Sequence, residues 1–282
     1  MLRTLKAAPL SAKIGMLLIA LYAFVAIFAP LIAPYPEAGI AGARYLPWAA
    51  PHWLGTDALG RDVLSRLIYG ARNTVGIALL TTILAFVLGA TLGLLAATLG
   101  GWFDTFSARL VDVLMAIPSL IFALLILTIS GTSAMALVLV IAVLDSTRVY
   151  RLSRAVAQDI LTMDYIEVAR MRGEGLGWIV RREVLPNAGA PLTAEFGLRF
   201  CFVFLFISAL SFLGLGLQPP TADWGSMVRE SAKLIAFANF ASWQAATFGL
   251  APLLPAGAIA LLTVAVNLVV DWILHLSSGL KE

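Results

Sequence analysis

Six long apolar runs constrain the fold of this chain more strongly than any other feature of its sequence. A helix needs about 20 mostly apolar residues to cross the hydrocarbon core of a membrane. Six stretches reach that length or come close to it: 14–33, 74–99, 111–130, 132–149, 190–217 and 248–276. Each run is continuous, whereas a membrane barrel would alternate apolar and polar residues over segments of about ten residues. Because only 12% of the residues are charged, about half the share in soluble domains, we predict an all-α membrane bundle of six transmembrane helices.

Basic residues fall mainly on one side of the predicted spans. Twelve lie on the side that holds both chain ends: Arg3, Lys6, Lys13, Arg109, Arg148, Arg151, Arg154, Arg170, Arg172, Arg181, Arg182 and Lys281. The opposite side holds six: Arg44, Arg61, Arg66, Arg72, Arg229 and Lys233. Since Lys and Arg concentrate in cytoplasmic segments, both termini and residues 164–186 are predicted to face the cytoplasm. The basic balance is therefore attributed to topology and not to a nucleic-acid partner.

The first apolar run follows basic residues, as the apolar part of a signal peptide would. It is longer than such a segment, however, and three prolines crowd the place where a cleavage site would lie. We expect a retained anchor, so that residues 1–70 form an anchor helix with an external segment and residues 71–282 form the transmembrane core. The single Cys201 lies within an apolar run, which excludes a disulfide framework or thiolate metal site.

The external segment changes character along its length. Prolines and glycines interrupt its first part, whereas residues 52–72 carry an apolar stripe at helical spacing, with Thr56 and Asp57 placed to cap its start. We interpret this part as an amphipathic helix that lies on the outer membrane surface or caps the bundle. The alternative is a contact with an external partner, through Asp57, Arg61 and Asp62 or through the loop 218–247 with Asp223, Trp224 and Arg229.

Proline and glycine punctuate the predicted spans. Pro118 lies within the third run and is expected to kink it, because proline lacks an N–H and clashes with the preceding turn. Residues 130–133 join the third and fourth runs in a tight connection, so these runs are predicted to form an antiparallel pair. Glycines within the second and fifth runs are expected at packing seams, where helix backbones approach closely.

A charged segment with three glycines, DYIEVARMRGEGLGWIVRREVLPN, interrupts the apolar runs at 164–187. Charge at this density excludes the segment from the hydrocarbon core. Asp164 and Glu167 fit an N-terminal capping pattern, which predicts a short helix over 165–172 that Gly173 ends. A second amphipathic piece is expected to follow and to end at Leu185–Pro186. Such a helix suits docking to a soluble partner, and an ordinary solvated loop helix is the alternative.

Several motifs together resemble one transporter family. Glu167–Val168–Ala169, Gly173 and Leu185–Pro186 resemble the Glu-Ala-Ala…Gly…Leu-Pro motif of ABC importer permeases. Other stretches resemble the shorter permease subunit of the peptide/nickel subfamily: GTDALGRD and SRLIYGAR within 55–72, VLPNA at 184–188, SFLGLGLQPPTADWGSM at 211–227, and the pair Asn267 and Asp271. The resemblance covers nearly the whole chain.

The resemblance implies a type I importer fold in a bacterial inner membrane, with a helix that couples the permease to a cytoplasmic ATPase. By position, the ATPase-coupling residues would be Glu167, Val168, Ala169, Arg170, Gly173, Leu185 and Pro186. The implied partners are a second permease, cytoplasmic ATP-binding subunits, a periplasmic solute-binding protein and membrane lipid. A peptide or similar small solute is expected, with nickel chelates, opines and oligosaccharides left open.

The chain departs from the family pattern at a few positions. Val168 replaces the middle alanine, Glu183 stands where many members carry histidine, and Ile207 stands where many carry glutamate. Glu195 and Arg199 lie one helical turn apart near the start of the fifth run, in an order that favours pairing. The sequence assigns no role to this pair.

The source of energy distinguishes an ABC permease from an ion-coupled transporter and from a membrane enzyme. No lysine follows the glycines of a phosphate-binding loop, so ATP and Mg²⁺ are expected on separate ATPase subunits and no cofactor on this chain. An ion-coupled transporter, the main alternative, would hold ionisable groups near the bilayer midplane. Asp112, Asp145 and Asp271 are instead expected near span ends, with Asp145 paired to Arg148. A membrane enzyme is disfavoured because no metalloprotease or serine-hydrolase motif is present.

Overall fold

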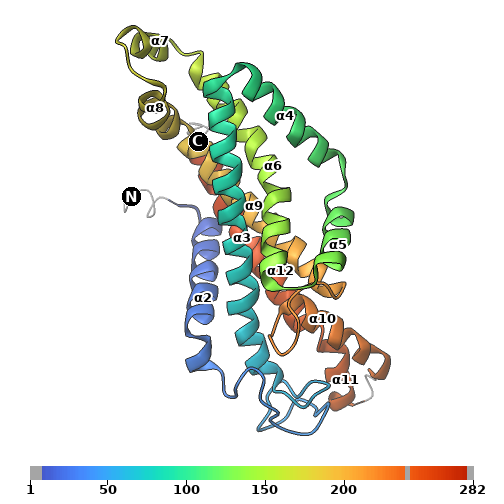
Figure 1. Ribbon diagram of the computed structural model, residues 1–282. Helices are drawn as coiled ribbons and strands as arrows, with labels where there is room; N and C mark the ends of the chain where they lie inside the picture. The colour runs from blue at the N-terminus through green and yellow to red at the C-terminus, as the bar shows by residue number, and fades with distance from the viewer. Residues whose placement is uncertain (1–7, 239–241, 278–282) are drawn as a thin grey trace.

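The computed structural model describes residues 8–238 and 242–277, and the regular structure of this part is helical (Figure 1). The long helices are α2 (Leu10–Ile32), α3 (Val63–Leu99), α4 (Gly101–Ala116), α5 (Ser119–Ser130), α6 (Ala134–Leu161), α9 (Leu185–Phe212) and α12 (Leu253–Ser277). The short ones are α7 (Asp164–Met171), α8 (Leu176–Ile179), the π-helix η1 (Val180–Val184), α10 (Trp224–Ala232), the 3₁₀ helix η2 (Lys233–Phe237) and α11 (Trp243–Leu250). Arg3, Lys6 and Lys281, used in the topology argument, lie outside the described residues.

Four of the described helical stretches are long and apolar enough to cross a membrane: α2, α3, the continuous helix Leu176–Phe212, and Ala246–Leu276. The pair α4 and α5 gives a fifth if it counts as one bent span. The remaining predicted span, 132–149, coincides from residue 134 onward with α6, whose apolar half ends at Asp145 and is followed by a charged half. The helical membrane fold is therefore confirmed, and the number of six spans stays a prediction.

Pro118 does more than kink the third predicted span. It lies between α4 and α5, whose axes differ by 85°, and it occupies the N-cap position of α5. Proline cannot donate to the carbonyl one turn earlier and crowds it, so α4 ends just ahead of it. The two helices form an arc along one side of the bundle (Figure 1).

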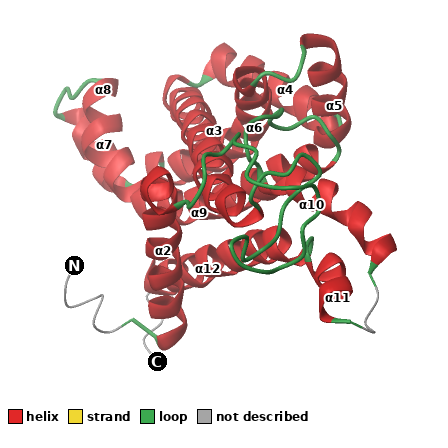
Figure 2. Cartoon of the chain, turned by 90° about the horizontal axis from the view of Figure 1, so that it is seen from below, coloured by secondary structure: helices red, strands yellow, loops and turns green. Residues whose placement is uncertain are grey.

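The helix α3 is the axis of the bundle and packs closely along α6. Seen along the bundle, α3, α6 and α9 lie centrally, α4 and α5 lie to one side, and α2 and α12 lie to the other (Figure 2). Gly89 and Gly93 let α3 and α6 approach, because a Cβ at Gly93 would lie 2.6 Å from the Tyr150 carbonyl oxygen. At the start of α10, the ring of Trp224 packs edge-on against Phe204 and Tyr22 at centroid distances of 6.2 and 5.8 Å.

Different segments occupy the two ends of the bundle. α7 and α8 project from one end, and the loop 33–62 with α10 and α11 covers the other (Figure 1). We name these the inner and the outer end after the predicted topology. The predicted helix over 52–72 is wrong in its first part, because residues 52–62 are irregular and α3 begins only at Val63. Its N-cap is Asp62, which accepts the Ser65 N–H, and not Thr56 or Asp57. Residues 63–72 are the outer end of a 37-residue helix and not a separate surface helix.

Candidate functional site

The projecting helix α7 is anchored by its apolar face and exposes its charged face. Ile166 and Ala169 are buried and pack in a cluster with Leu94, Ala157, Ile160, Ile179, Val184 and Ala188. Glu167, Val168 and Arg170 are exposed. An open hollow beside them is lined by residues from the end of α6 and from α7: Leu161, Thr162, Met163, Glu167, Arg170 and Met171. The spacing of the two buried residues thus fixes α7 on the inner ends of α3, α6 and α9 and leaves its other side free.

The two ends of α7 form differently. The predicted Asp164 cap is wrong, since Met163 is the N-cap without a side-chain bond and Asp164 is already helical. Asp164 and Glu167 still lie in the first turn, where negative charge favours a helix. At the other end, Gly173 has φ +79°, and the N–H groups of Gly173 and Glu174 donate to Arg170 and Ala169 at 2.9 and 3.2 Å. Two such backbone hydrogen bonds together with a left-handed glycine form a Schellman motif. The predicted end of the helix at Gly173 is therefore confirmed.

After the turn 172–175, one continuous helix leads toward the membrane. The second short piece was predicted to end at Leu185–Pro186, which is wrong, because Leu176–Phe212 is continuous. The π-helix η1 lies directly before Pro186, and Leu185 donates its N–H to Val180. A widened turn accommodates the missing proline N–H and ring at the start of α9. Leu185 and Pro186 remain exposed.

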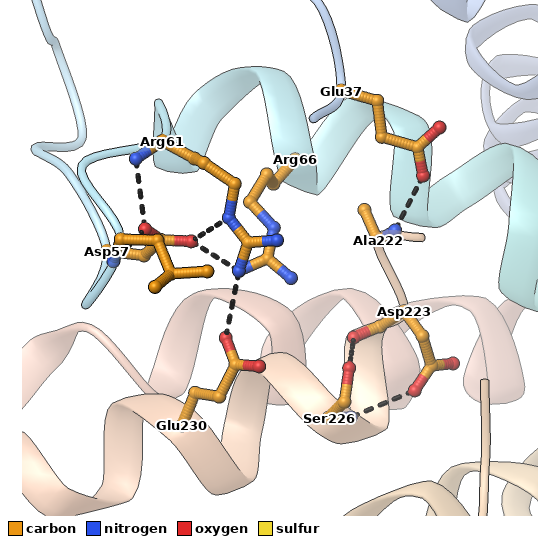
Figure 3. Close-up of polar contacts among 9 residues, drawn as sticks. Glu37, Asp57, Arg61, Arg66, Ala222, Asp223, Ser226 and Glu230 are labelled. Atoms are coloured by element: carbon orange, nitrogen blue, oxygen red, sulfur yellow. Dashed lines mark hydrogen bonds and ion pairs between the residues drawn. The ribbon is translucent and has the colours of Figure 1, made fainter. Parts of the chain in front are cut away.

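At the outer end, Asp57 is the centre of a buried network. Its carboxylate accepts the Leu59 and Arg61 backbone N–H groups at 2.8 and 2.9 Å, and Arg61 Nε and Arg66 Nη1 at 2.7 Å each (Figure 3). Arg66 Nη1 also donates to Glu230 of α10 at 2.8 Å. Burial alone would raise the pKa of Asp57, but the Arg61 N–H and the Arg66 guanidinium outweigh it, and the pKa lies below its usual range.

Two further carboxylates tie the outer loop and α10 to α3. Asp62 accepts from the Ser65 hydroxyl at 2.8 Å and lies 3.0 Å from His52 Nδ1. Asp223 caps α10 through the Ser226 N–H at 2.9 Å (Figure 3) and accepts the Thr74 hydroxyl at 3.0 Å. Burial raises the pKa of Asp223, and these hydrogen bonds offset only part of that effect.

The structure brings the predicted binding-protein contacts together but places most of them inside. Asp57, Arg61, Asp62, Asp223 and Trp224 are buried, and only Arg229 is partly exposed. These buried side chains hold the backbone of the outer loop and α10 in place but are not themselves open to a partner. The outer face itself presents apolar residues that sequence reasoning missed, namely Ile40, Trp53 and Leu59. A contact with a binding protein stays a prediction.

A charged cluster lies in the middle of the bundle between α6 and α9. The predicted Glu195–Arg199 pair forms, with 2.8 Å between Oε1 and Nε, and Arg199 Nη1 also lies 3.3 Å from Asp145 Oδ1. Asp145 is only 3% exposed, and it lies 4.0 Å from Arg148, so the predicted pair with Arg148 forms. Its other partner, Arg199, was not predicted. The partner that draws it inward is 54 positions away in the sequence, which no local pattern shows.

Comparison with known proteins adds the family. A family model described as "Binding-protein-dependent transport system inner membrane component" matches residues 89–278. The chain is 38% identical over 258 residues to the di/tripeptide transport system permease protein DppC of Pseudomonas aeruginosa, covering 88% of this chain and 83% of the relative. It is 31% identical over 270 residues to the probable D,D-dipeptide transport system permease protein DdpC of Escherichia coli, covering 95% and 87%. It is 34% identical over 183 residues to the glutathione transport system permease protein GsiD of Pectobacterium atrosepticum, covering 65% and 61%.

Proposed function

The chain belongs to the family of inner membrane components of binding-protein-dependent transport systems, and from this premise we propose that it passes peptides into the cell. It is a permease subunit of an ATP-binding-cassette importer and not an enzyme or an ion-coupled transporter. The substrate class rests on the relatives, whose names specify dipeptides, tripeptides, D,D-dipeptides or glutathione. All of these are short peptides. Nickel chelates, opines and oligosaccharides are therefore less favoured as solutes.

We further propose that α7 docks into a cytoplasmic ATP-binding subunit through Glu167, Val168 and Arg170. The observation that carries this proposal is the division of α7 into a buried face and an exposed one. Leu185 and Pro186 would border the docking surface, and Gly173 would fix its end. Because the buried face of α7 packs on Ile179 and Val184 of the continuous helix Leu176–Phe212, a push on α7 is passed to a spanning helix. That push shifts the balance between inward-open and outward-open states.

The remaining partners complete the proposed transporter. ATP and Mg²⁺ would be held by the separate ATPase subunits, and a second, related permease would form the other wall of the solute path. A periplasmic solute-binding protein would deliver the peptide to the end that carries the loop 33–62 and α10. In this arrangement α7 and both termini face the cytoplasm of a bacterial inner membrane.

A docking variant tests the proposal directly. Val168 is 40% exposed, so Val168→Asp places a charge on the docking face without disturbing the buried one. We expect the ATPase subunits to co-purify poorly and ATP-driven dipeptide uptake in vesicles to fall about tenfold or more, as for loss of an interface hot spot. Thr105→Asp, on an exposed position of α4, is the matched control and should leave both unchanged. Full co-purification and uptake with Val168→Asp would overturn the assignment of α7.

A further inference from the structure

An open hollow of about 820 Å³ lies where the break between α4 and α5 faces α6 and α9. Its lining includes Met115, Pro118, Ser119, Asp145, Arg148 and Phe202. We propose that this hollow is a solute site that binds a zwitterion, with an ammonium group at Asp145 and a carboxylate at Arg148. The proposal rests on the proposed function, because the solute is taken to be a short peptide with both termini free.

Asp145 supplies an acceptor that the described part of the chain leaves unused. Its side chain is 2% exposed, and its Oδ2 atom has no hydrogen-bond partner among residues 8–238 and 242–277. The other oxygen, Oδ1, lies 3.3 Å from Arg199 Nη1 and 4.0 Å from Arg148 Nη1. Since a buried carboxylate oxygen without a donor costs free energy, a solute ammonium group that donates to Oδ2 would be favoured.

Arg148 and α5 supply the opposite pole. The Arg148 guanidinium lies 4.2 Å above the Phe202 ring, and its nearest carboxylate, at 4.0 Å, is beyond hydrogen-bond distance. Its side chain is 36% exposed. Beside it begins the 12-residue helix α5, whose N-cap Pro118 makes no side-chain capping bond. The first N–H groups of a helix lack intrahelical acceptors and favour anions, so this corner suits a carboxylate.

The four charged residues at and beside the hollow have a net charge of zero. This balance favours a zwitterionic solute over a cation or an anion. Asp145 and Glu195 carry two negative charges, and Arg148 and Arg199 carry two positive ones. A cation or an anion that entered would meet one attractive and one repulsive pole. A short peptide with free termini presents both charges and can satisfy both poles together, whereas a capped peptide satisfies only one.

Capped dipeptides test the two poles separately. The complete transporter, with its second permease, ATPases and binding protein, would be assayed in vesicles for ATP-driven uptake of alanyl-alanine, its N-acetyl form and its C-terminal amide. Arg148→Gln should lower the preference for the free over the amidated form about tenfold, as for loss of one charged hydrogen bond, and spare the preference over the acetylated form. Asp145→Asn should do the reverse. The binding protein is the same in every variant, so its own selectivity cancels.

The outcomes separate this site from the proposed function. Arg109→Gln, at an exposed position of α4 that does not line the hollow, should change neither preference. Uptake that persists with both preferences unchanged in Arg148→Gln and Asp145→Asn would overturn the site alone, whereas no ATP-driven peptide uptake by the wild type would overturn both proposals. A dipeptide with a photoreactive diazirine side chain gives a second test on the unaltered transporter, independent of whether the variants assemble. Crosslinks within 114–120 or 141–148 would support the site, and crosslinks only elsewhere would overturn it.

Discussion

At the scale of single residues, Gly173 is required by backbone conformation and not by space. A Cβ there would meet nothing within 4 Å, yet φ is +79°, a region in which an L side chain costs about 1 kcal/mol or more. We expect Gly173→Ala to shift the end of α7 and to reduce ATPase co-purification and peptide uptake several-fold. Gly175 is equally uncrowded but has φ −75°, so Gly175→Ala is the control. Equal effects of the two substitutions would show that the left-handed turn is unimportant.

Asp57 is the residue on which the outer network depends most. Asp57→Asn would leave the buried Arg61 and Arg66 with Glu230 as their remaining anion, and breaking a buried ion pair costs about 3–5 kcal/mol. We expect a clear drop in the thermal stability of the purified protein, whereas Asn at the exposed Asp164 should change it little. Because the folded pKa of Asp57 is depressed, its stabilisation is present above the unfolded value of 3.8 and is lost as pH falls through the folded pKa. The variant should therefore lose less stability than the wild type on acidification below about pH 4.

At the scale of helices, the sequence predicted the glycine end of α7 but missed the starts of α3 and α7 and the continuous helix through Pro186. The Gly173 stop was predictable because a left-handed glycine is a local requirement. Proline was less informative, since Pro30 and Pro191 lie inside α2 and α9 whereas Pro118 separates two helices. The presence of a proline in an apolar run therefore does not by itself predict a break in the helix. The start of α3 was missed because the Asp57 carboxylate accepts the Leu59 and Arg61 backbone N–H groups in a turn where Gly60 has φ +80°, and the apolar stripe of 52–72 does not show this turn.

The contact between α3 and α6 predicts that replacing two glycines of α3 with alanine changes the stability of the protein in opposite directions. A Cβ at Gly93 would overlap the α6 backbone, while one at Gly76 would meet nothing within 4 Å. Gly93→Ala should destabilise the protein by about 1–3 kcal/mol through overpacking. Gly76→Ala should stabilise it by about 0.5–1 kcal/mol, because alanine is the better helix former. Thermal unfolding of the two variants in detergent measures both effects, and a Gly93→Ala protein as stable as the wild type would contradict the close packing of this seam.

At the scale of the whole molecule, one helix reaches from the outer network to the inner anchor of α7. α3 carries Arg66 and Thr74 at one end and Leu94 at the other, and its 37 residues span roughly 55 Å at about 1.5 Å per residue. A binding protein at the outer face and an ATPase at α7 would thus act on the same rigid element. The apolar runs predicted this bundle, but the polar networks at its ends and in its middle join residues from separate helices, so the sequence alone placed few of their partners.

The orientation of the molecule in the membrane can be tested by cysteine labelling, because the chain has a single cysteine. Cys201 is buried, at 6% exposure, so it should remain silent to a membrane-impermeant maleimide. Trp53 in the outer loop and Met171 at the end of α7 are 68% and 75% exposed, and a cysteine at either position would be open to the reagent. In intact spheroplasts we expect Trp53→Cys to be labelled and Met171→Cys to be labelled only after the membrane is permeabilised. The positive-inside rule places the arginine-rich end in the cytoplasm, so labelling of Met171→Cys from outside would reverse the orientation and remove α7 from the reach of a cytoplasmic ATPase.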